Sequence, residues 1–241
     1  MSTPSTNDLR AELACALRWA ARYDLHEAVA NHFSVATSDD GTRFLVNPAG
    51  RHFSEVRASE LVEVDADAAE QPNGVDPTAW CIHGALHRRH PQHRCVLHTH
   101  APAATALSCL QAPQLPPVDQ NAMRFYERMA VDTEFDGMGL GEEAERLATL
   151  AGGDIAIVLL GNHGVIALGE TVAHAFDNLY YFERACRTYL DALATGRPLR
   201  LPPPAVARRT AEQWLAYPGL AEDHFAALMR MLDREEPAFR E

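Results

Sequence analysis

The chain has little positive charge, no closely spaced cysteine pair and no long apolar run. Its 21 Lys and Arg residues face 33 Asp and Glu residues, which gives a formal net charge of -12. Because an acidic surface repels phosphate backbones, we expect no nucleic-acid partner. The five cysteines are odd in number, widely spaced and without a CxxC pair, which favours reduced thiols over a disulfide framework.

No segment has the composition of a membrane span or of a secretion signal. No uninterrupted apolar stretch approaches the ~20 residues that a bilayer requires. The N-terminal stretch MSTPSTNDLR has neither a basic region nor an apolar core, which is unlike a signal peptide. We therefore expect a soluble cytoplasmic protein with no membrane partner, and 241 residues are enough for one sizeable core.

Hydrophobic periodicity predicts alternating helices and strands. Amphipathic helices are expected over residues 5–25, 76–91, 140–153 and 170–196, with a short helix at 101–110. Strands are expected at 60–68 and 94–100 and in two hairpins, at 31–50 and 154–169. Because several strands are hairpin-linked, the pattern favours a layered α/β domain with a mixed or mainly antiparallel sheet.

The C-terminal part of the chain differs in composition from the rest. Residues 197–209, RPLRLPPPAVARR, contain three consecutive prolines and are predicted to form a stiff extended linker. One or two short helices are expected over residues 210–237. We therefore divide the chain into a domain at residues 1–197 and a Pro-rich linker with a C-terminal helical arm at 198–241. The arm is expected to pack on the core or on a neighbouring subunit.

Two short motifs place histidines at the ends of predicted buried strands. The stretch VLHTH contains His98 and His100, which project to the same face if the strand extends that far, as residues i and i+2 do. His163 lies in the turn GNHG, where the flanking glycines allow a sharp bend. A lone core histidine is more often hydrogen-bonded than metal-bound. Three histidines at the ends of two strands favour a metal site, because neutral imidazole is the commonest metal ligand.

These motifs, together with EAVANHFSV, FLVNPAG and WCIHGALHRRHPQHRC, resemble the class II aldolase/adducin family from about Leu9 to about Ala194. The adducin-like branch is the closer likeness. The resemblance implies a three-layer α/β/α fold around a mostly antiparallel mixed sheet, commonly assembled as a homotetramer. It also implies that His98, His100 and His163 hold a divalent metal ion that polarises a carbonyl or stabilises an enediolate. Zinc is expected first, with Fe, Mn, Ni and Co as the alternatives.

The chain departs from the family's aldolases at the start of its middle helix. In those enzymes an acidic residue precedes a tryptophan, whereas here Ala79 precedes Trp80, and an alanine cannot move a proton. Pro77 replaces one serine of the family's phosphate-binding pair, which disfavours a phosphorylated sugar. Three residues are expected to contact the substrate: Asn31, Gly50 and Thr78.

Four residues are candidates to replace the missing carboxylate, and each has a plain structural alternative. Glu27 and Asp76 lie nearest to the motif segments but are typical of solvated or helix-capping acids. His83 shares one helix face with His87 and could equally be a packed polar residue. Tyr126 follows the loop in which the family's aldolases carry a catalytic tyrosine, and its alternative is a packed loop residue.

Three functions stay open. The first is a metal-dependent lyase that cleaves a carbon–carbon bond of, or decarboxylates, a small hydroxy- or oxo-acid, with the ion as Lewis acid. The second is a non-haem metal oxygenase on the same fold. The third is a non-catalytic, adducin-like binding or assembly module, which Ala79 favours and the intact histidine trio opposes. We rank the lyase first, and we expect acid to release its metal because coordinating imidazoles must be neutral.

Overall fold

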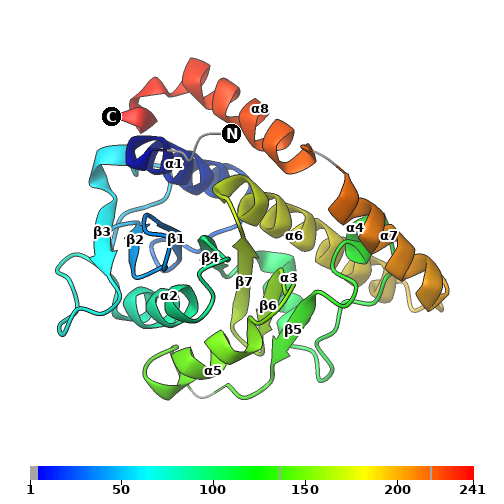
Figure 1. The fold of residues 1–241 in the computed structure, drawn as a ribbon. Coiled ribbons are helices and arrows are strands. Elements are labelled where there is room, and N and C mark those ends of the chain that lie inside the picture. Colours follow the sequence, from blue (N-terminus) through cyan, green and yellow to red (C-terminus); the bar gives the residue numbers. More distant parts are fainter. Residues whose placement is uncertain (1–4, 136, 218) are drawn as a thin grey trace.

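The computed structural model describes residues 5–135, 137–217 and 219–241. Its strands are β1 (His32–Ala36), β2 (Arg43–Val46), β3 (Val62–Asp65), β4 (Cys95–Thr99), β5 (Met129–Asp132), β6 (Ile157–Leu160) and β7 (Gly164–Gly169). They form one sheet in the order β3-β2-β1-β4-β7-β6-β5. Only β5 and β6 run parallel, and the other neighbouring strands are antiparallel. The expected mostly antiparallel mixed sheet is confirmed (Figure 1).

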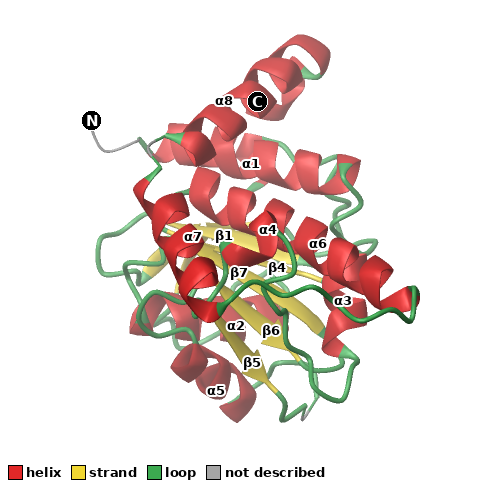
Figure 2. Ribbon diagram, turned by 90° about the vertical axis from the view of Figure 1, so that its right-hand side faces the viewer, coloured by secondary structure: helices red, strands yellow, loops and turns green. Residues whose placement is uncertain are grey.

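Helices cover both faces of this sheet (Figure 2). They are α1 (Thr6–Arg22), α2 (Pro77–Arg89), α3 (Pro102–Ser108), α4 (Gln120–Met123), α5 (Glu142–Leu150), α6 (Val172–Ala194), α7 (Pro204–Ala216) and α8 (Leu220–Glu235). Short 3-10 helices lie at Ala58–Glu60 and Pro237–Arg240. Helices α2 and α5 pack on one face, and α1, α3 and α6 pack on the other. The three-layer α/β/α fold is therefore confirmed.

Along each strand, successive side chains point to opposite faces of the sheet, and the apolar ones pack in the hydrophobic clusters on those faces. In β4, Cys95 and Leu97 join the cluster under α1 and α6, while Val96 between them joins the cluster under α2 and α5. This follows from the period of two along a strand. Apolar side chains of β4 therefore contribute to the core on both faces of the sheet, and His98 and Thr99 lie at the end of this strand.

Capping signals in the sequence set the helix starts that matter for the site. Helix α1 begins after Ser5, which forms a reciprocal capping box with Asp8. Helix α2 begins after Asp76, whose side chain accepts from the backbone N–H groups of Thr78 and Ala79. Pro77 occupies the first helical position, where a missing N–H costs nothing.

Two local predictions differ from the structure. Strand β5 was not predicted, because its four residues, three half-buried and one buried, give no clear alternation; it forms by pairing with β6. The predicted extended linker is too long, since α7 begins at Pro204, and only residues 197–203 of the predicted linker lie outside a helix. A proline is well tolerated at the first position of a helix, so the triple proline ends in a helix start.

Helices α7 and α8 lie along the outside of α6 and α1 (Figure 1). The Trp19 indole on α1 donates to the carbonyl of Leu228 on α8 at 3.0 Å, and Arg18 pairs with Glu236 at 2.5 Å. Within the described parts of the chain, no helix is both long enough and apolar enough to cross a membrane.

Candidate metal centre

His98, His100 and His163 converge at one end of the sheet. His98 lies in β4, His100 follows the last residue of that strand, and His163 lies in the turn between β6 and β7. Because β4 and β7 are antiparallel, with Thr99 opposite Val165, the end of β4 adjoins this turn. One ligand atom of each histidine lies within 4.8 Å of the other two. The structure thus brings together the three residues that the sequence singled out.

Glycines let the turn approach β4 so closely. A Cβ on Gly164 would lie 2.5 Å from the carbonyl oxygen of Thr99 and 2.9 Å from the His100 ring. A Cβ on Gly161 would lie 2.8 Å from the carbonyl oxygen of Asp132. Any larger residue at either position would push the turn away, and the histidine between them with it.

Hydrogen bonds fix which nitrogen of His98 and of His100 is available. The His98 Nδ1 lies 3.2 Å from the carbonyl oxygen of Val165, and the His100 Nδ1 lies 2.6 Å from the Glu27 carboxylate. Both partners can only accept, so both Nδ1 atoms carry the hydrogen and both Nε2 atoms keep a lone pair. The His100 Nε2 is buried and, among the described residues, has no hydrogen-bond partner. These residues therefore fit a divalent transition metal, which takes such nitrogen lone pairs.

Burial favours the neutral form of the His98 and His163 imidazoles. Desolvation, followed by the neighbouring His32 ring, lowers the pKa of His98 well below its ordinary value. Desolvation followed by the charge of His100 lowers the pKa of His163 to about 4. Neutral rings are the form that binds a metal, so at pH 7 no proton has to be displaced from either of these two.

The buried histidines predict a loss of stability in acid. Burial lowers the pKa of His32 to about 4 and that of His87 to about 3, from an ordinary value of 6.5. Between pH 6.5 and about 4 the unfolded chain therefore binds more protons than the folded one. The free energy of unfolding of the metal-free protein should fall as the pH drops through this window. Chemical unfolding at several pH values tests this. A smaller slope is expected for His87→Asn, and a flat profile would contradict the prediction.

The three substrate-binding candidates are placed differently. The Asn31 Oδ1 accepts from the backbone N–H of Glu27 at 2.6 Å, which turns its Nδ2 the other way. That Nδ2 is buried and has no partner in the described structure. The Thr78 hydroxyl is already bonded to Asp76 and lies 3.1 Å from His32. Gly50 lies in an exposed turn at φ +72, where an added Cβ would meet nothing within 4 Å. Only Asn31 thus offers a free buried donor.

Three of the catalytic candidates also lie in different surroundings. Glu27 reaches His100, although 65% of its side chain is exposed. His83 is fully buried and bonds to His32 rather than to the trio. The ring of Tyr126 lies beneath Arg208 of α7, 5.9 Å from that guanidinium. Tyr126 is therefore a packing partner of α7.

Position 79 holds no hidden acid–base group. Ala79 is 1% exposed and packs with Phe44 and Val46 of β2. Sequence reasoning missed one residue of this region, His32 on β1. The centroid of its ring lies 4.8 Å from that of His98. A buried strand beginning with His-Phe-Ser, with His and Ser on one face, was the available signal.

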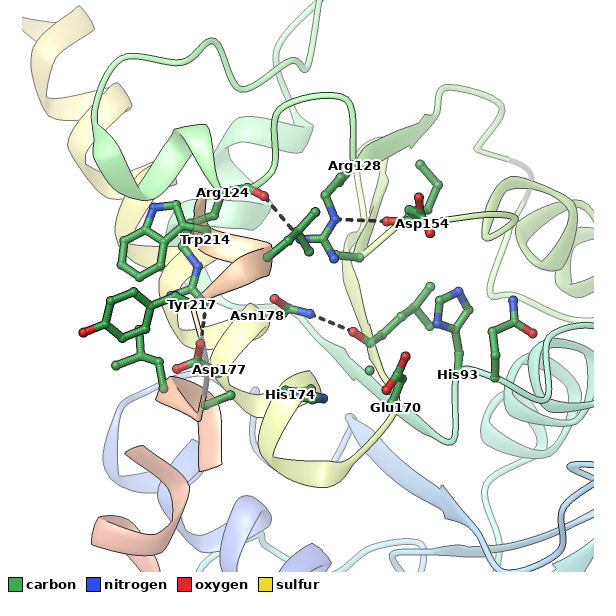
Figure 3. A pocket seen from close by; sticks show the side chains of 18 of the residues that line it. His93, Arg124, Arg128, Asp154, Glu170, His174, Asp177, Asn178, Trp214 and Tyr217 are labelled. Atoms are coloured by element: carbon green, nitrogen blue, oxygen red, sulfur yellow. Dashed lines mark hydrogen bonds and ion pairs between the residues drawn. The ribbon is translucent and has the colours of Figure 1, made fainter. Parts of the chain in front are cut away.

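A cavity of about 530 Å³ lies elsewhere in the described structure (Figure 3). It opens beyond the end of β7 and is bounded by α6 and by the junction of α7 and α8. Polar side chains line it, including Arg124, Arg128 and Asp177, and none of the trio does. Volume alone therefore does not identify the candidate centre.

A family model matches most of the chain. Residues 11–190 match the model described as Class II Aldolase and Adducin N-terminal domain. The chain belongs to this family.

Individual relatives within the family differ in what their names describe. The chain is 34% identical to decarboxylase NovR from Streptomyces niveus, over 90% of this chain and 83% of the relative. It is 32% identical to a 4-hydroxy-3-prenylphenylpyruvate oxygenase/4-hydroxy-3-prenylbenzoate synthase from Streptomyces roseochromogenus, over 91% of this chain and 82% of the relative. It is 30% identical to human beta-adducin over 93% of its own length, but it spans only 33% of that longer protein.

A solved structure shares the whole fold. The crystal structure of an aldolase II superfamily protein from Pseudomonas syringae matches with a TM-score of 0.88 and 32% sequence identity. The match covers 100% of this chain and 98% of that one, so the helices after the triple proline belong to the shared architecture.

Proposed function

We propose that the protein is a metal-dependent lyase that cleaves a carbon–carbon bond of, or decarboxylates, a small hydroxy- or oxo-acid. The observation that carries this proposal is the trio His98, His100 and His163, with ligand atoms within 4.8 Å of one another and a buried, unpartnered Nε2 on His100 among the described residues. A divalent ion held there supplies a Lewis acid next to the breaking bond. Zinc is the first candidate.

The amino-acid composition removes the main alternative route to the same chemistry. All 21 residues counted as Lys and Arg are arginine, and these 241 residues include no lysine. Lysine is the side chain that forms a Schiff base with a carbonyl substrate, and this sequence offers none. Electron withdrawal is left to an ion and to hydrogen-bond donors such as the Asn31 amide.

Ala79 favours decarboxylation over aldol cleavage. Cleavage of a β-hydroxy carbonyl begins with removal of the hydroxyl proton, which needs a positioned base. Decarboxylation of a 3-oxo acid needs none: the electrons of the carbon–carbon bond move to the carbonyl oxygen, and water returns a proton afterwards. The buried alanine surrounded by apolar side chains provides no such base at residue 79. A relative named as a decarboxylase supports the same choice.

Glu27 is assigned to orient His100. Its carboxylate lies 2.6 Å from the His100 Nδ1, the arrangement by which outer carboxylates hold metal-binding imidazoles. We expect Glu27→Gln to weaken metal binding by about 10–100-fold, the usual cost of losing such a partner. Competition with a chromophoric chelator measures this, with Glu55→Gln, another exposed acid, as the control. Equal affinities in the two variants would show that Glu27 is merely solvated.

The proposed function is tested by turnover. Tag-free protein loaded with Zn, Fe, Mn, Ni or Co is offered a panel of small 3-oxo and hydroxy acids under argon and under air, with CO₂ and aldehydes as readouts. Turnover under argon supports the lyase. A strict need for O₂ supports the second candidate, an oxygenase, which a relative's name favours. No turnover by any loaded form would leave the adducin-like binding module. A cytoplasmic homotetramer remains a prediction.

A further inference from the structure

A fourth imidazole lies against the histidine trio. His32 on β1 is paired with His98 on β4, and the two ring centroids are 4.8 Å apart. His32 is 2% exposed, so it belongs to the same buried wall. A fourth protein ligand would matter, because structural zinc sites are closed by four ligands and catalytic sites keep one position open.

Both nitrogens of His32 are already engaged. Its Nε2 lies 3.1 Å from the Thr78 hydroxyl, and its Nδ1 lies 2.7 Å from the His83 Nε2. The Thr78 hydroxyl donates to the Asp76 carboxylate, which can only accept. Thr78 must therefore accept from His32, so the hydrogen of His32 is on Nε2. Its Nδ1 lone pair then accepts from the His83 Nε2–H.

Donors and acceptors can be assigned in the same way for the buried residues beneath α2. With its hydrogen on Nε2, His83 accepts at Nδ1 from the Ser34 hydroxyl. Ser34 in turn accepts from the His87 Nε2–H at 2.7 Å. His83 and His87 are both fully buried, so water does not compete for these bonds. Every donor in the series points toward Asp76, and only one set of tautomers satisfies it.

The members of this series face one another because of their spacing along β1 and α2. His32 and Ser34 are two residues apart on β1 and face the same side, while His83 and His87 are one turn apart on α2. The two pairs interleave where the strand and helix pack. Burial lowers the pKa of His83 well below its ordinary value, which keeps the middle of the series neutral.

We propose that this hydrogen-bond series, from His87 to Asp76, withholds His32 from the metal and so keeps the three-histidine centre open to substrate. The inference rests on the proposed metal site. A neutral imidazole has one lone pair, and the His83 N–H occupies the one on His32. His83 is thus a positioning residue: it acts on the centre by holding a neighbouring ring, without touching the ion.

Copper(II) loading tests this without any turnover assay. Pulsed EPR with ¹⁵N-histidine counts the imidazoles bound to the ion: we expect three in the wild type and four in His83→Phe, which keeps a ring but loses the donor. The double variant His32→Phe/His83→Phe should return to three. His83→Gln keeps a side-chain N–H donor and should also keep three.

Each other result has a definite meaning. Three imidazoles in a folded His83→Phe protein would overturn the inference while leaving the metal site standing. A wild type that takes up no copper, zinc or iron would overturn the metal site itself, and the inference with it. Should His83→Phe fail to fold, ¹⁵N NMR of the metal-free wild type decides: a hydrogen on the Nδ1 of His32 would contradict the series, and one on Nε2 would support it.

Discussion

His163→Ala is expected to empty the metal centre while leaving the protein folded. The variant removes one of three ligands, so affinity should fall by more than about 100-fold, since even an outer-shell partner is worth about 10–100-fold. The fold should survive because the turn is held by its backbone, in which the N–H of residue 163 donates to the carbonyl of Leu160 at 3.1 Å. The ring itself is only half-buried.

Elemental analysis of protein purified without a polyhistidine tag is the measurement. About one ion per chain is expected in the wild type and almost none in His163→Ala, with unchanged circular dichroism. His174→Ala is the matched control, because that histidine is paired with Glu222 at 3.1 Å on the arm side of the molecule and should not affect metal content. Retention of wild-type metal by His163→Ala would make the turn histidine structural.

The sequence predicted the trio because each part of it is a local pattern. Alternation put His98 and His100 on one face of a strand, and flanking glycines marked His163 as a turn residue. What brings them together is the pairing of β4 with β7, which depends on strand order and is not encoded in any short segment. The family resemblance supplied that step.

The neighbours of the trio could not be predicted in the same way. In the sequence, Glu27 resembles an ordinary solvated acid, and its side chain is largely exposed. It nevertheless lies against the ring of His100, 73 positions further along the chain. A contact of that kind depends on the loop before β1, where Ala28 adopts a positive φ of 47. His32 was overlooked because one histidine and one serine on a strand face do not reveal their partners, and those of His32 lie 46 and 51 positions away.

A buried ion pair of the core lies at the junction with the arm. Arg124, 9% exposed, binds Asp177 of α6, which is 1% exposed and also lies 2.8 Å from the His224 Nδ1 of α8. The Arg124 guanidinium lies 4.1 Å from the ring centroid of Tyr181 and 4.7 Å from that of Trp214 on α7. A single side chain thus joins α4, α6 and α7 along one wall of the large cavity (Figure 3).

Arg124→Ala is therefore expected to be strongly destabilising. It leaves the Asp177 carboxylate buried with only His224 beside it, and breaking a buried pair in this way costs about 3–5 kcal/mol. For a chain of this size that corresponds to a fall in Tm of roughly 6–20 °C. Thermal unfolding measures the loss, and limited proteolysis should detect faster cleavage in residues 198–203, because α7 is held less firmly.

Arg208→Ala provides the control on the same arm. Arg208 pairs with Glu127 across the surface, where both side chains are more than half exposed, so solvent already satisfies each charge and little change in Tm is expected. If the fall in Tm of Arg124→Ala is no larger than that of Arg208→Ala, the arm is held by its apolar face and not by the buried pair. Below its unfolding temperature, Arg124→Ala should still bind metal normally, since the pair lies beyond the other end of β7 from His163.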